Sequence, residues 1–213
     1  MNKDKFIKVG RCKIDKGVLI HAGSVIGKPY RRDLDGHTEQ AGGTVIKKGV
    51  YIGYFCLVGA KSIIGASSIL DDRSSVESNV TLGSRNLLIY SAHLCSDVRI
   101  GSDCIIGGFI GDRTIIGSHC RIFGNIVHQQ QNPTAPWDAE SSMEPSAKIH
   151  DYVFAGFNSV ISGPVSIGPR AYILPGALIT KDVPAYHIAS GINCVVHHSR
   201  WKGSLSKSPI FCK

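Results

Sequence analysis

The sequence lacks several features that would assign it to a class at once. No stretch of 18 apolar residues occurs, so no membrane-spanning helix is predicted. The first ten residues, MNKDKFIKVG, are charged and contain no apolar segment, so we expect no signal peptide, no membrane partner and a cytoplasmic location. The seven cysteines show no metal-site spacing, which predicts no metal and no disulfide framework.

The charge is unbalanced, but its distribution is not that of a nucleic-acid-binding protein. The formal net charge is +8, and the basic residues are scattered rather than gathered into a recognised nucleic-acid motif. We therefore expect no nucleic-acid partner. The excess of positive charge is either an ordinary soluble surface or a source of attraction for an anionic ligand.

The sequence does contain an aliphatic residue at every sixth position over most of its length. Of 23 such hexad starts, 22 are Ile, Leu or Val, and the exception is Ala155. Gly often follows the aliphatic residue, and the fifth position is usually small, as at Cys56, Cys104 and Cys120. These cysteines are therefore expected in the core. The uninterrupted runs are 14–26, 46–106, 110–122 and 149–179.

A period of six excludes helices as the main element. A helix turns every 3.6 residues and would spread these aliphatic side chains around its surface. Six is a multiple of the strand period of two, and a six-residue repeat is the signature of β-helices built from hexapeptides. The aliphatic side chains are then predicted to fill a narrow interior. The Gly and the small residue are predicted to let the chain bend between short strands.

The pattern over about residues 11–196 resembles the left-handed parallel β-helix of hexapeptide-repeat acyltransferases. The resemblance implies an all-β fold in which three hexads, or 18 residues, make one triangular coil. The 23 hexads then predict seven to eight coils. We expect one domain over 1–196 and a basic C-terminal tail over 197–213, which forms a short helix or strand or stays mobile.

Two long interruptions break the repeat, and both are expected to leave the coil as surface loops. Residues 28–44 form either a tolerated insertion or a loop that contacts the acceptor or another subunit. Residues 127–148 contain three prolines that forbid a long helix. Trp137 in this second loop either packs against a neighbouring subunit or holds a ligand.

His128 is the main catalytic candidate. It lies six residues after Ile122, where the next inward aliphatic residue is expected, and it opens the second interruption. A base with a pKa near 7 suits removal of a proton from an attacking hydroxyl or amine. His150, which follows an inward Ile, is the second candidate.

The segment after Ala147 is similar to the final coils of galactoside, serine and xenobiotic acetyltransferases, and closes with Thr180, Lys181, Asp182, Val183 and Pro184. In that family a general-base histidine precedes this block by an excursion loop, and His128 matches it. The partner of its ring is left open between Asn125, Asp138 and Glu140. The histidine spacing of a zinc site of the γ-carbonic-anhydrase type is absent.

The same resemblance implies acetyl-CoA or another acyl-CoA as co-substrate and a homotrimer with sites between subunits. Phe154 replaces a family tryptophan, and the basic residue expected near the close is absent, with Arg200 following later. Acceptor contacts are assigned to Asn125, Trp137 and Asp138. The expected acyl-CoA contacts are Gly156, Phe157, Pro175, Ala177, Thr180, Lys181 and Arg200.

The leading hypothesis is transfer of an acetyl or similar small acyl group to a hydroxyl or amine of a small polar acceptor. A sugar, a nucleotide-sugar or an antibiotic is the expected acceptor class. The alternative is a non-catalytic hexapeptide-repeat scaffold, which would have no need of a base at the start of the second loop.

Overall fold

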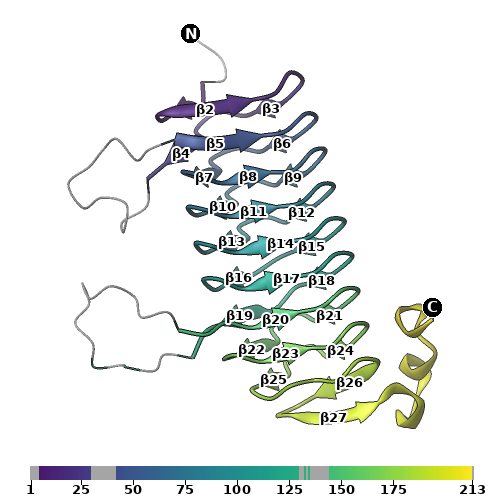
Figure 1. Cartoon of the computed structure of the whole chain (residues 1–213). Helices are drawn as coiled ribbons and strands as arrows, with labels where there is room; N and C mark the ends of the chain where they lie inside the picture. Colours follow the sequence, from purple (N-terminus) through teal and green to yellow (C-terminus); the bar gives the residue numbers. More distant parts are fainter. Residues whose placement is uncertain (1–4, 30–41, 130–131, 133, 135–143, 213) are drawn as a thin grey trace.

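The computed structural model describes residues 5–29, 42–129, 132, 134 and 144–212. Short parallel strands wind into a left-handed β-helix whose three sheets form the faces of a triangular prism (Figure 1). The all-β prediction is confirmed. We call the faces A, B and C in the order in which the chain visits them, and the edges A–B, B–C and C–A.

The three faces contain nine, eight and ten strands. Face A consists of β1 (Ile7–Lys8), β4 (Val25–Lys28), β7 (Leu57–Gly59), β10 (Ser75–Val76), β13 (His93–Leu94), β16 (Phe109–Ile110), β19 (Asn125–Val127), β22 (Val160–Ser162) and β25 (Leu178–Ile179). Face B consists of β2 (Arg11–Ile14), β5 (Gly42–Ile46), β8 (Ile63–Ile64), β11 (Thr81–Leu82), β14 (Arg99–Ile100), β17 (Ile115–Ile116), β20 (Lys148–Ile149) and β23 (Ser166–Ile167). Face C consists of β3 (Leu19–Ile20), β6 (Tyr51–Ile52), β9 (Ile69–Leu70), β12 (Leu87–Leu88), β15 (Ile105–Ile106), β18 (Arg121–Ile122), β21 (Phe154–Ala155), β24 (Tyr172–Ile173), β26 (His187–Ser190) and the antiparallel β27 (Cys194–His197).

The predicted aliphatic positions form the core. In most strands they are the second residue, and each pairs with its counterpart one coil away, as Leu82 pairs with Ile64 and Ile100. All of them are buried except Ile14 and Ile20, which are partly buried near the N-terminal end. The three predicted core cysteines are buried as well. Stacking in register therefore converts the sequence period into one continuous interior.

The stack has about nine coils, more than the seven to eight predicted. Four strands, β1, β19, β26 and the antiparallel β27, lie outside the counted hexads. Strand β19 was missed because its buried residue, Ile126, comes only four residues after Ile122. The same four-residue spacing separates Ile106 from Ile110 one coil earlier. Because Ile106 pairs with Ile122 and Ile110 with Ile126, both short turns lie at the C–A edge.

The structure revises the expected role of the glycine that follows the aliphatic residue. Most of these glycines, Gly59 and Gly65 among them, have ordinary φ angles, but an added Cβ would overlap the backbone of the next coil. The bend is instead made by the fourth residue of the hexad. This residue has a left-handed φ even where it is not glycine, as at Lys61 (φ 59°) and Arg113 (φ 60°).

The C-terminal tail forms three short 3-10 turns, η3 (His198–Arg200), η4 (Ser204–Lys207) and η5 (Pro209–Phe211). Phe211 is buried and its ring stacks on His198 with centroids 4.5 Å apart. Arg170 donates a hydrogen bond to the carbonyl oxygen of Ile210 at 2.9 Å, which ties the tail to the B–C edge. Among the described residues, no helix has the length and apolar character needed to cross a membrane.

Neighbouring residues of β17 provide a matched test of the core. Ile116 is 2% exposed, whereas Ile115 is 46% exposed on the outer surface of the same strand. We expect Ile116→Ala to lower the free energy of unfolding by about 2–5 kcal/mol because it leaves a cavity. Ile115→Ala should change it by less than about 0.5 kcal/mol. Urea denaturation measures both, and equal losses would contradict the assigned strand orientation.

Candidate functional site

His128 does not occupy an inward position, contrary to the prediction. Ile126 takes that place, because its step from Ile122 is four residues and it pairs with Ile110 and Ile161. His128 follows the end of β19 at the A–B edge, and its side chain is about one-third exposed. The residue is therefore at the exit of the second excursion, as predicted, but it replaces no core aliphatic.

The ring of His128 is held by a carboxylate from the other end of the excursion. His128 Nε2 lies 3.0 Å from Glu144 Oε2, and the Glu144 side chain is only 9% exposed. His128 Nδ1 is buried and has no hydrogen-bond partner among the described residues. With Glu144 accepting the Nε2 hydrogen, the lone pair of a neutral ring lies on Nδ1. The pair thus has the base-and-orienter arrangement of nucleophile-activating sites.

Contacts from the preceding coil hold Glu144 in place. Arg113 Nη2 donates to the carbonyl oxygen of Glu144 at 2.9 Å, and the Ser146 hydroxyl donates to the carbonyl oxygen of Asp112. The position of this acid is therefore fixed by the coil and not by the loop alone.

Glu144 was not among the predicted partners of His128. Asn125 points elsewhere: its Oδ1 accepts a hydrogen bond from the backbone N–H of Phe109 at 2.9 Å and links the two short turns of the C–A edge. Asp138 and Glu140, together with the predicted acceptor contact Trp137, lie outside the described residues. The sequence contained a signal for this residue, because Glu144 is the last acidic residue before the repeat resumes at Ile149.

His150, the second catalytic candidate, is placed differently. Its Nε2 lies 3.3 Å from the hydroxyl oxygen of Ser166 at the B–C edge. No carboxylate contact to its ring is found among the described residues, and it is separated from His128 by face B. It therefore serves as a comparison residue for the pair at the A–B edge.

The predicted acyl-CoA contacts divide into three groups. Gly156, Phe157, Pro175 and Ala177 gather at the C–A edge, where an added Cβ on Gly156 would lie 2.6 Å from the nitrogen of Pro175. Phe157 is 59% exposed and stacks on Phe123 with centroids 4.7 Å apart. Ala177 is buried in the core, so it offers a ligand only its backbone.

The other predicted contacts lie at the A–B edge and in the tail. Thr180 follows β25, and its hydroxyl and backbone N–H both bond to the Asn193 side chain at 2.8 Å. Lys181 beside it is exposed, and Arg200 ends η3 near the tail. The structure therefore does not bring the seven predicted residues into one site of a single chain.

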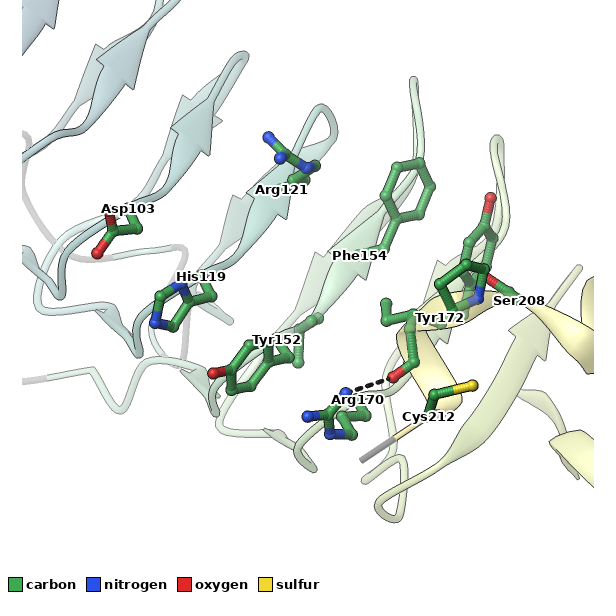
Figure 2. Close-up of a pocket in the computed structure, with 12 residues that line it drawn as sticks. Asp103, His119, Arg121, Tyr152, Phe154, Arg170, Tyr172, Ser208 and Cys212 are labelled. Atoms are coloured by element: carbon green, nitrogen blue, oxygen red, sulfur yellow. Dashed lines mark hydrogen bonds between the residues drawn. The ribbon is translucent and has the colours of Figure 1, made fainter.

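Sequence reasoning missed a pocket of about 580 Å³ between face C and the tail. Its floor is the outward column Arg121, Phe154 and Tyr172, which pair in register on β18, β21 and β24. Phe154 and Tyr172 stack with centroids 4.4 Å apart, and burial raises the pKa of the Tyr172 hydroxyl. Figure 2 shows these side chains beside the tail residues Ser208 and Cys212.

One wall of the pocket is a second column, at the B–C edge. His119 stacks on Tyr152 with centroids 4.7 Å apart, and the guanidinium of Arg170 lies 4.4 Å from the centre of the Tyr152 ring (Figure 2). Asp103 also borders the pocket, but Arg85 binds its carboxylate at 2.7 Å and lowers its pKa. The pocket thus combines aromatic rings with two arginines. Asp103, the carboxylate among its described lining residues, is already paired with Arg85.

The pocket and the His128–Glu144 pair lie at the same height but on opposite sides of the prism. The pocket uses β18, β21 and β24, while the pair lies between β19 and β20. The filled core separates face C from the A–B edge. One small ligand therefore cannot touch both in one chain.

Comparisons with known proteins agree with the repeat. The family model described as bacterial transferase hexapeptide (six repeats) matches residues 146–181. The bifunctional protein GlmU of Synechococcus elongatus is 32% identical over 174 residues, which are 74% of this chain and 38% of that protein. The chain spans 35% of the corresponding Nostoc protein, so it matches little more than a third of either relative.

Solved structures with similar coils have low sequence identity. The polysialic acid O-acetyltransferase OatWY is 15% identical, with 95% of each chain covered and a TM-score of 0.44. UDP-N-acetylglucosamine O-acyltransferase from Moraxella catarrhalis is 16% identical, with 86% of this chain and 70% of that chain covered and a TM-score of 0.41. Over residues 146–181 the chain is therefore similar to the hexapeptide-repeat family of bacterial transferases, and its described coils follow the same six-residue repeat.

Proposed function

We propose that the protein transfers an acetyl or similar small acyl group from acyl-CoA to a hydroxyl or amine of a small polar acceptor. The acceptor class is a sugar, a nucleotide-sugar or an antibiotic. The observation that carries the proposal is the His128–Glu144 pair, in which Nε2 is fixed by a nearly buried carboxylate and Nδ1 has no partner among the described residues.

His128 acts as the general base through Nδ1. The acceptor hydroxyl or amine gives its proton to Nδ1 as its oxygen or nitrogen attacks the thioester carbon. Glu144 keeps the ring oriented and stabilises the imidazolium that forms. Backbone N–H groups of the coil or loop stabilise the oxyanion of the tetrahedral intermediate. The carbon–sulfur bond then breaks, and the imidazolium returns the proton to the coenzyme A sulfur.

We assign the nucleotide end of acyl-CoA to the face C pocket. Arg121 offers a cation for a phosphate, and the stacked Phe154 and Tyr172 offer an apolar, aromatic surface for the planar base. The pantetheine arm then runs over the C–A edge at Gly156, Phe157 and Pro175, with Ala177 contributing backbone only. Thr180, Lys181 and Arg200 are kept as proposed contacts in the assembled protein.

The proposed assembly is a homotrimer in which the pocket of one subunit faces the His128–Glu144 pair of the next. A single chain holds these two features on opposite sides of a filled prism, whereas a head-to-tail interface between identical prisms brings them together. Acceptor contacts are assigned to Asn125, Trp137 and Asp138. Light scattering is expected to give three times the 22.9 kDa chain mass.

Replacement of His128 tests the base. His128→Asn keeps a donor for Glu144 but has no basic nitrogen, so acceptor-dependent release of coenzyme A thiol from acetyl-CoA should fall by about 10² or more. Glu144→Gln should cause a loss of about 10-fold or more because the ring is no longer held by a charge. His150→Ala is the matched control and should stay near the parent. Full activity in a folded His128→Asn would remove His128 as the base.

Mixing two inactive variants tests the shared site. His128→Asn lacks the base, and Arg121→Glu replaces one of the two pocket cations with an anion, so each variant alone should be inactive. Trimers formed by equal co-expression should together recover about a quarter of the parent activity, because about one interface in four then combines an intact pair with an intact pocket. No recovery in proven mixed trimers would mean that the pair and the pocket do not act together across an interface.

A further inference from the structure

Three metal-ligating side chains meet at the A–B edge, away from the His128–Glu144 pair. Glu77 follows β10 and Cys95 follows β13, and these two strands pair in register. His93 is the first residue of β13. The carboxylate oxygen, the imidazole nitrogen and the Cys95 sulfur all lie within 4.8 Å of one another.

The donor set is the one that zinc prefers. Zinc binds thiolate, imidazole and carboxylate at about 2.0–2.3 Å, which separates neighbouring donors of a tetrahedral site by about 3.4–3.6 Å. His93 Nε2 already lies 3.0 Å from Glu77 Oε1, and the sulfur is within 4.8 Å of both. The three donor atoms therefore already lie near the spacing that a tetrahedral site requires.

The surroundings hold two of the ligands in position. Ser96 donates its hydroxyl hydrogen to Glu77 Oε2 at 2.8 Å, so the other oxygen, Oε1, faces His93. The ring of Phe109 lies 5.4 Å from that of His93, centroid to centroid. Cys95 is 7% exposed, whereas His93 and Glu77 are half-buried. Such outer contacts orient ligands and are typical of metal sites.

We propose that Glu77, His93 and Cys95 form a zinc-type site with three protein ligands and a fourth position open to water or another small ligand. Binding would expel the Cys95 thiol proton and use the lone pair of His93 Nε2, so affinity should fall in acid. The site would also clamp two adjacent coils of face A. The proposal is independent of acyl transfer, because it concerns different residues about two coils away.

The full-length chain, first stripped with a chelator, should bind one equivalent of Zn²⁺ in competition with a chromophoric chelator. Cys95→Ser, His93→Gln and Glu77→Gln should each weaken binding by about 100-fold or more, and Ser96→Ala by about 10-fold. Cys56→Ser is the matched control, since it removes a buried thiol elsewhere in the stack and should bind as the parent does. Co²⁺ in place of Zn²⁺ should give a thiolate-to-cobalt absorption band that Cys95→Ser abolishes.

Circular dichroism of every variant distinguishes loss of Zn²⁺ binding from loss of folding. If Cys95→Ser fails to fold, the Zn²⁺ affinity of Glu77→Gln still tests the site. The proposal is overturned if the parent binds no equivalent of Zn²⁺. It is equally overturned if the folded Glu77→Gln and His93→Gln variants bind as tightly as the parent. Loss of the equivalent only on replacing the exposed Cys194 or Cys212 would assign it to adventitious surface thiols.

Discussion

The stacking of inward aliphatic side chains in 18-residue register is the constraint on which the rest of the structure depends. Each buried Ile, Leu or Val contributes about 1.5–3 kcal/mol by leaving water, and each rests on its counterpart in the adjoining coil. A shift by one residue would turn every such side chain outward. The register therefore also fixes the outward residues in columns, and both proposed ligand sites are built from columns of this kind.

The same constraint explains where the excursions occur. Both leave after a face A strand, β4 or β19, and return to a face B strand, β5 or β20 (Figure 1). Insertion between two complete strands changes no core position, so the stack resumes in register, as the pairing of Ile116 with Ile149 shows. The ends of the second excursion thereby come together, and His128 meets Glu144 although 16 residues separate them in sequence.

The fold was predictable because its period is carried by the side chains that make the core. The coil count was too low because four strands lie outside the counted hexads, among them β19, where a four-residue step places Ile126, and not His128, inside. His128 does lie at the exit of the second excursion, as its position at the start of the interruption predicts, and its catalytic role stays a prediction. Glu144 and the pocket were missed for a physical reason. Glu144 contacts a residue on the other side of an excursion, so the two are far apart in the sequence. The pocket residues are recognised as a column only when the sequences of successive coils are aligned.

The cluster of Glu77, His93 and Cys95 could not be predicted for the same reason, because residues 16 and 18 positions apart match no linear metal motif.

The central claim is that this prism is an acyl-CoA-dependent enzyme and not a scaffold. Thermal unfolding with and without acetyl-CoA tests it most directly. A ligand selective for the folded state adds about 2.7 kcal/mol at 100 times its Kd. The account predicts a saturable rise in Tm of several degrees that Arg121→Glu removes. An unchanged Tm at every acetyl-CoA concentration would contradict it.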